Sequence, residues 1–349
     1  MMQIPFAEDV SPTPLSEVRG RLAPSPTGLL HLGNAWAFLM AWFLCRSRQG
    51  SLVLRMEDID PARSSSAYVQ KQIEDLRWLG LDWDEGPDER DIAGERGPYA
   101  PYTQSARHHL YTEALKRLEH DGHLYPCFCT RKELRLLAGA PHVGDEGAPY
   151  PGTCRFLTPE ERLARSAGGR AASLRFACPD ERIPFTDIIR GPCSMDLKAC
   201  GGDFALRRSD GVIAYQLAVV VDDALMRIRQ VVRGRDILAS TPRQLALFRA
   251  LGYPPPVYAH IPLVCDVAGE RLAKRHQSLG LAALREEGVD PRAVVGYLGW
   301  KSGLVPDARL VHPKELLRYV PDSFPSWWRT RDIVLDAEPV ALLRSFGVR

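Results

Sequence analysis

The segment at residues 21–34 carries residue types whose order favours the binding of a phosphate. Pro24 and Pro26 cannot lie inside a helix or a central strand, and Gly28 frees the turn that follows them. We expect an apolar helix to begin near His31. A strand, a rigid turn and a helix start present backbone N–H groups and the positive end of the helix dipole to an anion. The segment matches neither a P-loop nor the glycine pattern of a dinucleotide-binding fold, so a nucleotide would bind in a third way.

A second group of polar residues follows the next predicted strand. The first helix (31–47) leads into a buried strand at residues 51–56, which predicts a βαβ unit with parallel strands and a right-handed crossover. Ligands of open α/β sheets lie beyond the carboxyl ends of the strands, so residues 21–25 and 57–60 should share one edge. The acidic residues 57–60 are equally typical of a solvated loop that leads into a helix, and that alternative stays open.

Three of the cysteines have the spacing of a metal site. Cys127 and Cys129 form a Cys-x-Cys pair, and Cys154 follows further along the chain. In a reducing compartment a tight cysteine cluster indicates metal binding more often than a disulfide. A structural zinc site needs four ligands, so the fourth would be Tyr150 or His142, with histidine the chemical default. Buried cysteines without a metal remain the alternative.

Length and composition limit the class of protein. A chain of 349 residues can bury a full core and is expected to form two or three domains. The formal net charge of +2 gives no polybasic signature, so nucleic-acid binding would need a local basic face. No apolar run reaches the ~18–20 residues of a membrane span, and the N-terminus lacks the apolar core of a signal peptide. We therefore expect a cytoplasmic protein without a membrane partner.

The rest of the pattern predicts an α/β fold whose parallel sheet is interrupted after about residue 120 and then completed. Short strands from residue 173 to 189 precede a hairpin at 203–215 with an Asp-Gly turn. The apolar residues 217–221 and 228–232 are interpreted as further strands.

A helix is expected from Thr241, followed by a strand at 257–264. The basic loop at 269–276 is typical of solvated surface and would matter only if it folded over the edge that holds residues 21–25. Helical patterns at 280–287 and 291–302 precede a tail rich in proline.

These motifs together resemble a known family. The first signature of the class I aminoacyl-tRNA synthetases, in its glutamate and glutamine form, is similar to residues 21–28 and 31–34. Arg-Leu-Ala-Lys-Arg occupies residues 271–275, where the second signature, Lys-Met-Ser-Lys-Ser, would lie. Further matches to the glutamyl branch are residues 55–60, 102–107 and 232–234. Five motifs in this order make chance implausible.

The resemblance narrows to one branch of that family. A complete glutamyl-tRNA synthetase has a large helical anticodon-binding region after the second signature, whereas this chain ends at Arg349, soon after His276. This is similar to the truncated paralogues that attach glutamate to queuosine in tRNA(Asp). The resemblance implies a class I Rossmann-like parallel-sheet catalytic domain with an inserted zinc-containing subdomain and a short helical C-terminal region. The domains it implies are a loose arm (1–18), two halves of the catalytic domain (19–120 and 201–280), the inserted subdomain (121–200) and a helical end without an anticodon-binding domain (281–349).

The resemblance also implies a reaction and its residues. Glutamate would be activated by ATP with Mg²⁺, without tRNA, and then passed to the queuosine at the wobble position of tRNA(Asp). For glutamate binding, the matching positions are Arg21, Ala23, Ser25, Glu57, Tyr215 and Arg233. For ATP they are His31, Gly33, Asn34 and Lys274, with His31 and Lys274 as the catalytic pair. For one structural zinc ion they are Cys127, Cys129, Tyr150 and Cys154, which selects Tyr150 over His142.

The second signature departs from the family pattern, because Arg271 replaces its first lysine and Ala273 its first serine. Three alternatives follow from other readings of the same motifs. One is a truncated glutamyl-tRNA synthetase that charges the tRNA 3′ end. The others are a catalytically inactive tRNA-binding paralogue and a nucleotidyltransferase that uses no tRNA. We expect the protein to be a monomer.

Overall fold

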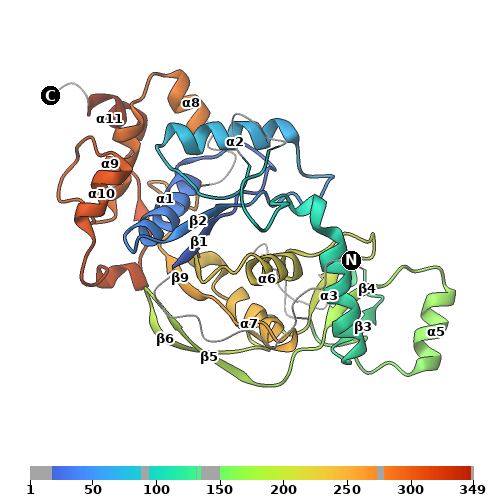
Figure 1. The fold of residues 1–349 in the computed structure, drawn as a ribbon. Coiled ribbons are helices and arrows are strands. Elements are labelled where there is room, and N and C mark those ends of the chain that lie inside the picture. Colours follow the sequence, from blue (N-terminus) through green and yellow to red (C-terminus); the bar gives the residue numbers. More distant parts are fainter. Residues whose placement is uncertain (1–17, 88–93, 131, 135–149, 273–278, 347–349) are drawn as a thin grey trace.

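The βαβ unit predicted at the start of the chain is present. The structure is a computed structural model that describes residues 18–87, 94–130, 132–134, 150–272 and 279–346 (Figure 1). Strands β1 (Arg19–Leu22) and β2 (Ser51–Leu54) are parallel, and α1 (Leu32–Arg46) connects them. Both strands are buried except at their first residues, as expected for a parallel sheet covered on both faces.

A second set of strands continues the sheet. Its order is β6 (Gly191–Asp196), β5 (Arg182–Asp187), β9 (Val257–Ile261) and β8 (Gln230–Gly234). The pairs β8–β9 and β5–β9 are parallel, while β5 and β6 form an antiparallel hairpin. The Arg229 N–H donates to the Arg19 carbonyl at 2.8 Å, so β8 lies beside β1. The carboxyl ends of β1, β2, β8 and β9 therefore meet at one edge, which we call the ligand edge.

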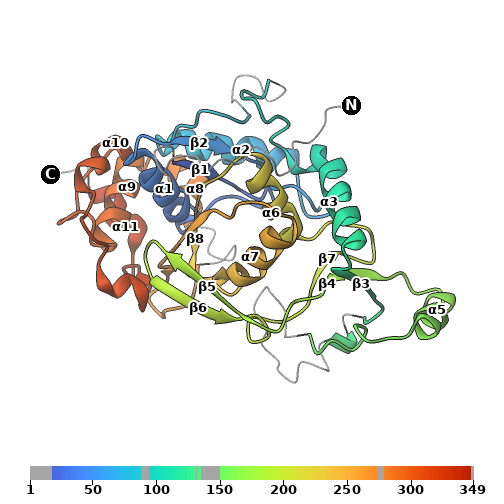
Figure 2. The ribbon, with the colours of Figure 1, turned by 60° about the horizontal axis from the view of Figure 1, so that its bottom comes forward.

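Helices cover both faces of this sheet. Helix α2 (Ser66–Trp78) lies on the side of β2, and a 3₁₀ turn, η1 (Gln104–Arg107), leads into α3 (His108–His120). Helices α6 (Tyr215–Leu225) and α7 (Ser240–Ala250) pack together with α3 around one apolar core (Figures 1 and 2). A second core surrounds α1 and extends to the C-terminal helices.

The prediction of a strand at residues 217–221 is wrong, because these residues lie within α6. The run of valines gives this segment a high β propensity. However, its side chains are buried on nearly all sides between α3, α7 and the sheet, and burial decides such a segment against propensity. The helix also brings Asp223 to Arg55, directly after β2, and Asp222 to Arg107 in η1, and both arginines are buried.

The inserted region has a small sheet of its own. Strands β3 (Leu124–Cys127), β4 (Ser173–Phe176) and β7 (Phe204–Arg207) are antiparallel, and α5 (Pro159–Ala167) projects at the rim of the molecule (Figure 2). β7 forms the first arm of the predicted Asp-Gly hairpin. At the turn that follows β7, the Arg208 N–H donates to the Val212 carbonyl at 2.9 Å. Its second arm makes a single bridge, between Arg207 and Ile213, rather than a full strand.

The C-terminal elements, including the proline-rich tail, pack in the core that surrounds α1. They are β10 (Val264–Cys265), α8 (Leu281–Glu286), α9 (Pro291–Lys301), α10 (Pro313–Leu316), η4 (Leu317–Tyr319), η5 (Ser326–Arg329), β11 (Ile333–Val334) and α11 (Pro339–Ser345). The 3₁₀ turn η2 (Arg235–Ile237) lies earlier in the chain, directly after β8. The rings of Trp36 in α1 and Trp328 in η5 meet edge to face at 5.5 Å between centroids. Both helices predicted after residue 280 are confirmed as α8 and α9.

Within the described residues, no helix combines the length and the apolar character needed to cross a membrane. The predicted arm lies almost wholly in residues 1–17, outside the described part of the chain.

A buried arginine fastens the sheet to α6. The Arg55 guanidinium is fully buried, donates to Asp223 at 2.7 Å and to Glu57 at 3.0 Å, and lies 3.9 Å from Asp222. Removal of one partner of such a network leaves buried charges without compensation.

We predict that Arg55→Met lowers the free energy of unfolding by about 3–5 kcal/mol, because Asp223 and Glu57 lose their buried counter-ion. Lys116→Met is the matched control, since Lys116 is exposed and its pair with Glu113 spans 3.9 Å. Urea unfolding of both variants measures the difference. Equal effects of the two substitutions would contradict a structural role for Arg55.

A buried carboxylate on α2 makes stability depend on pH. Asp75 is fully buried, its oxygens accept no hydrogen bond within the described structure, and the Arg285 Nη1 lies 3.7 Å away. Burial raises the pKa of Asp75 to about 6. The folded protein therefore holds the proton of Asp75 more tightly than the unfolded chain does. The stability that this proton gives to the folded state is complete below about pH 4 and is lost as the pH rises through about 6.

We predict that Asp75→Asn gains stability relative to the unaltered protein as the pH rises from 4 to 7, by up to about 3 kcal/mol. The amide cannot ionise, so it avoids the cost of burying a charge. Urea unfolding at several pH values measures this, with the exposed Asp180→Asn as control. A difference that does not change with pH would show that Asp75 does not titrate between its folded and unfolded values.

Candidate active site

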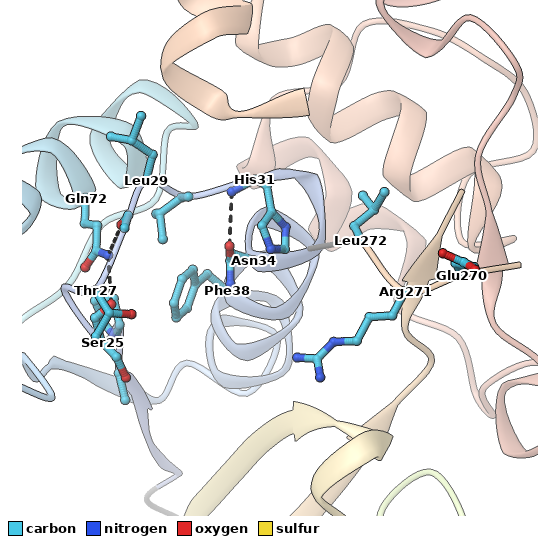
Figure 3. Close-up of a pocket in the computed structure, with 14 residues that line it drawn as sticks. Ser25, Thr27, Leu29, His31, Asn34, Phe38, Gln72, Glu270, Arg271 and Leu272 are labelled. Atoms are coloured by element: carbon cyan, nitrogen blue, oxygen red, sulfur yellow. Dashed lines mark hydrogen bonds between the residues drawn. The ribbon is translucent and has the colours of Figure 1, made fainter. Parts of the chain in front are cut away.

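The turn between β1 and α1 is held by α2. The Gln72 side-chain amide, 1% exposed, donates to the carbonyls of Ser25 at 3.0 Å and Gly28 at 2.8 Å (Figure 3). The Ser65 N–H donates to the Pro26 carbonyl at 3.0 Å. The turn predicted from its prolines is therefore fixed at both ends from a neighbouring helix.

His31 caps α1 at the ligand edge. Its Nδ1 accepts from the Gly33 N–H at 3.1 Å, and the Asn34 side chain accepts from the His31 N–H at 3.1 Å. Because Nδ1 accepts, a neutral His31 ring carries its proton on Nε2, the form that can donate to a phosphate. A Cβ at Gly33 would come within 3.0 Å of the His31 ring, so glycine lets the ring lie close to the helix start.

A cavity of about 710 Å³ opens in front of this helix start. Its lining includes Ala23, Ser25, His31, Asn34, Phe38, Gln72, Arg271 and Leu272. Figure 3 shows Arg271 extending toward α1 from the opposite side of the cavity. The basic loop is thus more than solvated surface, since its first residues face the ligand edge. The residues that follow, among them Ala273 and Lys274, lie outside the described residues.

Arg271 also pairs with Asp236, which lies in η2, two residues after the end of β8. The Leu272 N–H donates to the Val264 carbonyl at 3.1 Å, which ties the loop to β10. This anchoring places the start of the second signature across the cavity from the first.

The residues predicted to bind glutamate lie deeper along the same edge. Arg21 is buried and its Nε lies 3.3 Å from Asp223 Oδ1. The Glu57 N–H donates to the Pro24 carbonyl at 2.9 Å, which confirms that residues 21–25 and 57–60 share one edge. Asp58 accepts from Ser105 and Asp60 pairs with Arg208, so the acidic segment is bound to its surroundings rather than a solvated loop.

These residues are near enough to influence one another electrostatically, and the Arg21 Nη1 donates at 3.4 Å to the carbonyl of Val232, the residue before Arg233. Burial raises the pKa of Tyr215, while the positive charges of Arg233 and Arg21 oppose the rise and Glu57 and Asp223 reinforce it. Burial likewise raises the pKa of Glu57, against the lowering effect of Arg55 and Arg21. The structure therefore brings Arg21, Glu57 and Arg233 into one buried group with both signs of charge, and Tyr215, which is 38% exposed, lies at its solvent side.

Several residues around this group were not assigned from the sequence. Asp222 accepts from Arg107 at 2.6 Å, from Gln104 at 2.8 Å and from Tyr111 at 2.9 Å. The acidic pair at the end of an apolar segment was the available signal, but only the folded chain shows which arginines face it. The buried residues that surround Arg233 were also not anticipated; they are Asp187, Thr241, Gln244, Tyr258 and His260.

The cysteine cluster has the geometry of a metal site. The Sγ atoms of Cys127, Cys129 and Cys154 lie within 4.8 Å of one another, and those of Cys129 and Cys154 are 3.6 Å apart. A tetrahedral zinc with Zn–S bonds of about 2.3 Å separates its sulfurs by about 3.8 Å, so the cluster fits such an ion. The Tyr150 hydroxyl lies 3.3 Å from Cys127 Sγ and 3.6 Å from Cys129 Sγ. His142, the other candidate ligand, lies outside the described residues.

Comparison with known proteins gives a consistent result. The family model described as "tRNA synthetases class I (E and Q), catalytic domain" matches residues 17–316. A relative from Nitratidesulfovibrio vulgaris named "Glutamyl-Q tRNA(Asp) synthetase" is 57% identical over 298 residues, which cover 85% of this chain and 90% of that protein. A relative of the same name from Symbiobacterium thermophilum is 55% identical, covering 85% of this chain and 90% of that protein.

Longer proteins are also similar. "Glutamate--tRNA ligase" from Aquifex aeolicus is 42% identical over 82% of this chain, which spans 58% of that protein. The crystal structure of a glutamate-tRNA synthetase from Elizabethkingia anophelis has a TM-score of 0.77 at 27% identity, over 94% of this chain and 70% of that one. The βαβ unit, the ligand edge and these matches agree that the chain belongs to the class I tRNA synthetases of the glutamate and glutamine group, and within them to the glutamyl-Q tRNA(Asp) synthetase family.

Proposed function

We propose that this protein is a cytoplasmic, monomeric ligase that activates L-glutamate with ATP, without tRNA, and transfers the glutamyl group to queuosine at the wobble position of tRNA(Asp). The single observation that carries the proposal is the ligand edge. There a capped helix start and a cavity adjoin a buried group with two cations, Arg21 and Arg233, and an anion, Glu57. Glutamate and ATP are both anionic, so one site must hold them together and stabilise charge on phosphate.

In this proposal the two ends of residues 21–34 have separate tasks. His31, Gly33 and Asn34 lie at the start of α1 and bind ATP, where the helix dipole and the His31 Nε2–H favour phosphate. Arg271 adds a cation on the far side of the cavity. Mg²⁺ accompanies ATP and neutralises its phosphates when bound. Lys274 supplies a cationic point charge that stabilises the pyrophosphate leaving group.

Glutamate binds at the buried end. Arg21 and Arg233 each hold a carboxylate, since a guanidinium can bind one with two parallel hydrogen bonds. Glu57 pairs with the ammonium group, and Tyr215 shapes the pocket together with Ala23 and Ser25. Arg55 keeps Glu57 in place, because its 3.0 Å contact orients that carboxylate from behind.

The acceptor assignment rests on two relatives named "Glutamyl-Q tRNA(Asp) synthetase", each of which matches 85% of this chain over 90% of its own length. The direct test of this assignment is to incubate the protein with labelled glutamate, unlabelled ATP and tRNA(Asp). The tRNA carries either queuosine or guanosine at the wobble position. We expect label only on the queuosine form, and we expect it there even when that tRNA lacks its 3′-terminal adenosine. Label that requires the 3′ end would support the alternative of a truncated glutamyl-tRNA synthetase, and no label on any tRNA would support an inactive paralogue.

We predict that Lys274→Ala slows glutamyl-adenylate formation by about 100-fold or more, the scale seen when a transition-state charge partner is removed. Its effect on the KM for glutamate should be small, because the lysine contacts the leaving group rather than the amino acid. Pre-steady-state adenylate formation measures both quantities, with the exposed Lys198→Ala as control. Equal losses in rate and in glutamate binding would contradict this role.

We predict that the purified protein contains about one zinc ion per chain, bound by Cys127, Cys129, Cys154 and Tyr150. Cys154→Ser should abolish zinc binding and make the region around β3 and β4 sensitive to proteases. Cys193→Ser is the control, because Cys193 lies on β6 away from the cluster. Elemental analysis decides the outcome: a metal-free protein after purification under reducing conditions, or a zinc-replete Cys154→Ser variant, would exclude the site.

A further inference from the structure

Arg233 is held by buried polar side chains from two neighbouring elements, β9 and α7. On β8 its Nε donates to His260 Nε2 on β9 at 3.0 Å, and the two residues are direct partners in the strand register. Its Nη1 donates to Gln244 Oε1 and its Nη2 to Thr241 Oγ1, both on α7 and both at 2.8 Å. The Arg233 side chain is 5% exposed and His260 is fully buried.

The direction of these hydrogen bonds fixes the state of His260. A guanidinium can only donate, so His260 Nε2 must accept from it and must carry no proton. The proton then lies on Nδ1, which donates to Asp187 Oδ2 at 2.6 Å. Burial, joined by the positive charge of Arg233, lowers the pKa of His260 against the opposing effect of Asp187, which agrees with a neutral ring.

Asp187 is itself immobilised at the end of β5. Its carboxylate accepts from the backbone N–H groups of Ile189 and Arg190, both at 2.9 Å, and from that of His260 at 3.1 Å. Burial raises the pKa of Asp187, but the His260 ring, together with the backbone N–H groups of Arg190 and Ile189, outweighs this effect and keeps the pKa below its usual value. A fixed anion thus orients a neutral ring, and the ring orients the guanidinium.

The intervening ring has an electrostatic consequence. A carboxylate placed directly on Arg233 would neutralise the guanidinium and compete with an anionic ligand. The neutral imidazole supplies an acceptor without a charge and keeps the negative charge of Asp187 one ring further away. Since a guanidinium has five N–H groups and three of its nitrogens each make one such bond, two N–H groups remain for a carboxylate.

We propose that Asp187 and His260 are positioning residues for amino acid binding: through the Asp187–His260–Arg233 chain they aim the free N–H groups of Arg233 at one carboxylate of the substrate. This deepens the proposed function and rests on it. Neither residue contacts the substrate, and their effect reaches it only through Arg233. Their contribution should therefore appear in the KM for glutamate and not in the KM for ATP, which binds at the start of α1.

The test is glutamate-dependent ATP–pyrophosphate exchange with variants at His260. His260→Leu removes the acceptor, leaves a buried N–H of Arg233 unpaired and should raise the KM for glutamate by about tenfold or more. The KM for ATP should stay within about twofold. His260→Gln keeps an uncharged acceptor and should restore part of the loss. His123→Leu is the control, because the half-buried His123 ring contacts Phe176 in the inserted region instead.

Thr241→Val keeps the test decisive if His260→Leu does not fold. It is isosteric, removes the acceptor of Arg233 Nη2 and should raise the KM for glutamate several-fold. The inference is overturned if the folded variants keep the glutamate KM of the unaltered protein, or if the KM values for glutamate and ATP rise in parallel. An unaltered protein with no glutamate-dependent exchange would instead contradict the proposed function.

Discussion

The site depends on one buried carboxylate, that of Asp223. It lies 2.7 Å from Arg55 Nη1 and 3.3 Å from Arg21 Nε; Arg21 is on β1, and Arg55 directly follows the adjacent strand β2. Buried arginines need such partners, since an uncompensated charge in the core costs several kcal/mol. Because Asp223 stands on α6, its bonds fasten that helix to the sheet and orient Arg21 and, through Arg55, Glu57. The stability of the core and the arrangement of charges at the ligand edge therefore have the same origin.

A second constraint separates the two anions that the proposed reaction must join. The turn between β1 and α1 is held by Gln72, so Arg21 and the start of α1 are kept at a fixed separation. The cavity lies over the helix start, and the buried group lies behind the turn. On this account the molecule binds phosphate with a helix end and the amino acid with buried side chains, and the rigid turn sets the distance between them.

The features that follow from local sequence were predictable. The turn at Pro24 and Pro26, the parallel β1–β2 pair and the shared edge of residues 21–25 and 57–60 are confirmed. They depend on proline geometry, a glycine and the rule for strand ends, all of which act within a few residues or one crossover. The motif order also identified the family, because it spans most of the chain.

The features that depend on distant partners were not predictable in the same way. Residues 217–221 have strand propensity yet form a helix, because packing between α3, α7 and the sheet decides their conformation. His260 is an isolated polar residue within the apolar strand β9, and Asp187 is the last residue of β5. Only the alignment of β5, β9 and β8 shows that they form a chain to Arg233. No local pattern reports such a register.

The central claim is that one edge of this sheet binds glutamate and ATP together and joins them before any RNA is present. ATP–pyrophosphate exchange, measured with purified protein in the absence of tRNA, tests that claim most directly. The account predicts exchange that requires L-glutamate, saturates with it and is not supported by other amino acids at the same concentration. Exchange that is absent until tRNA is added, or that proceeds without glutamate, would contradict it.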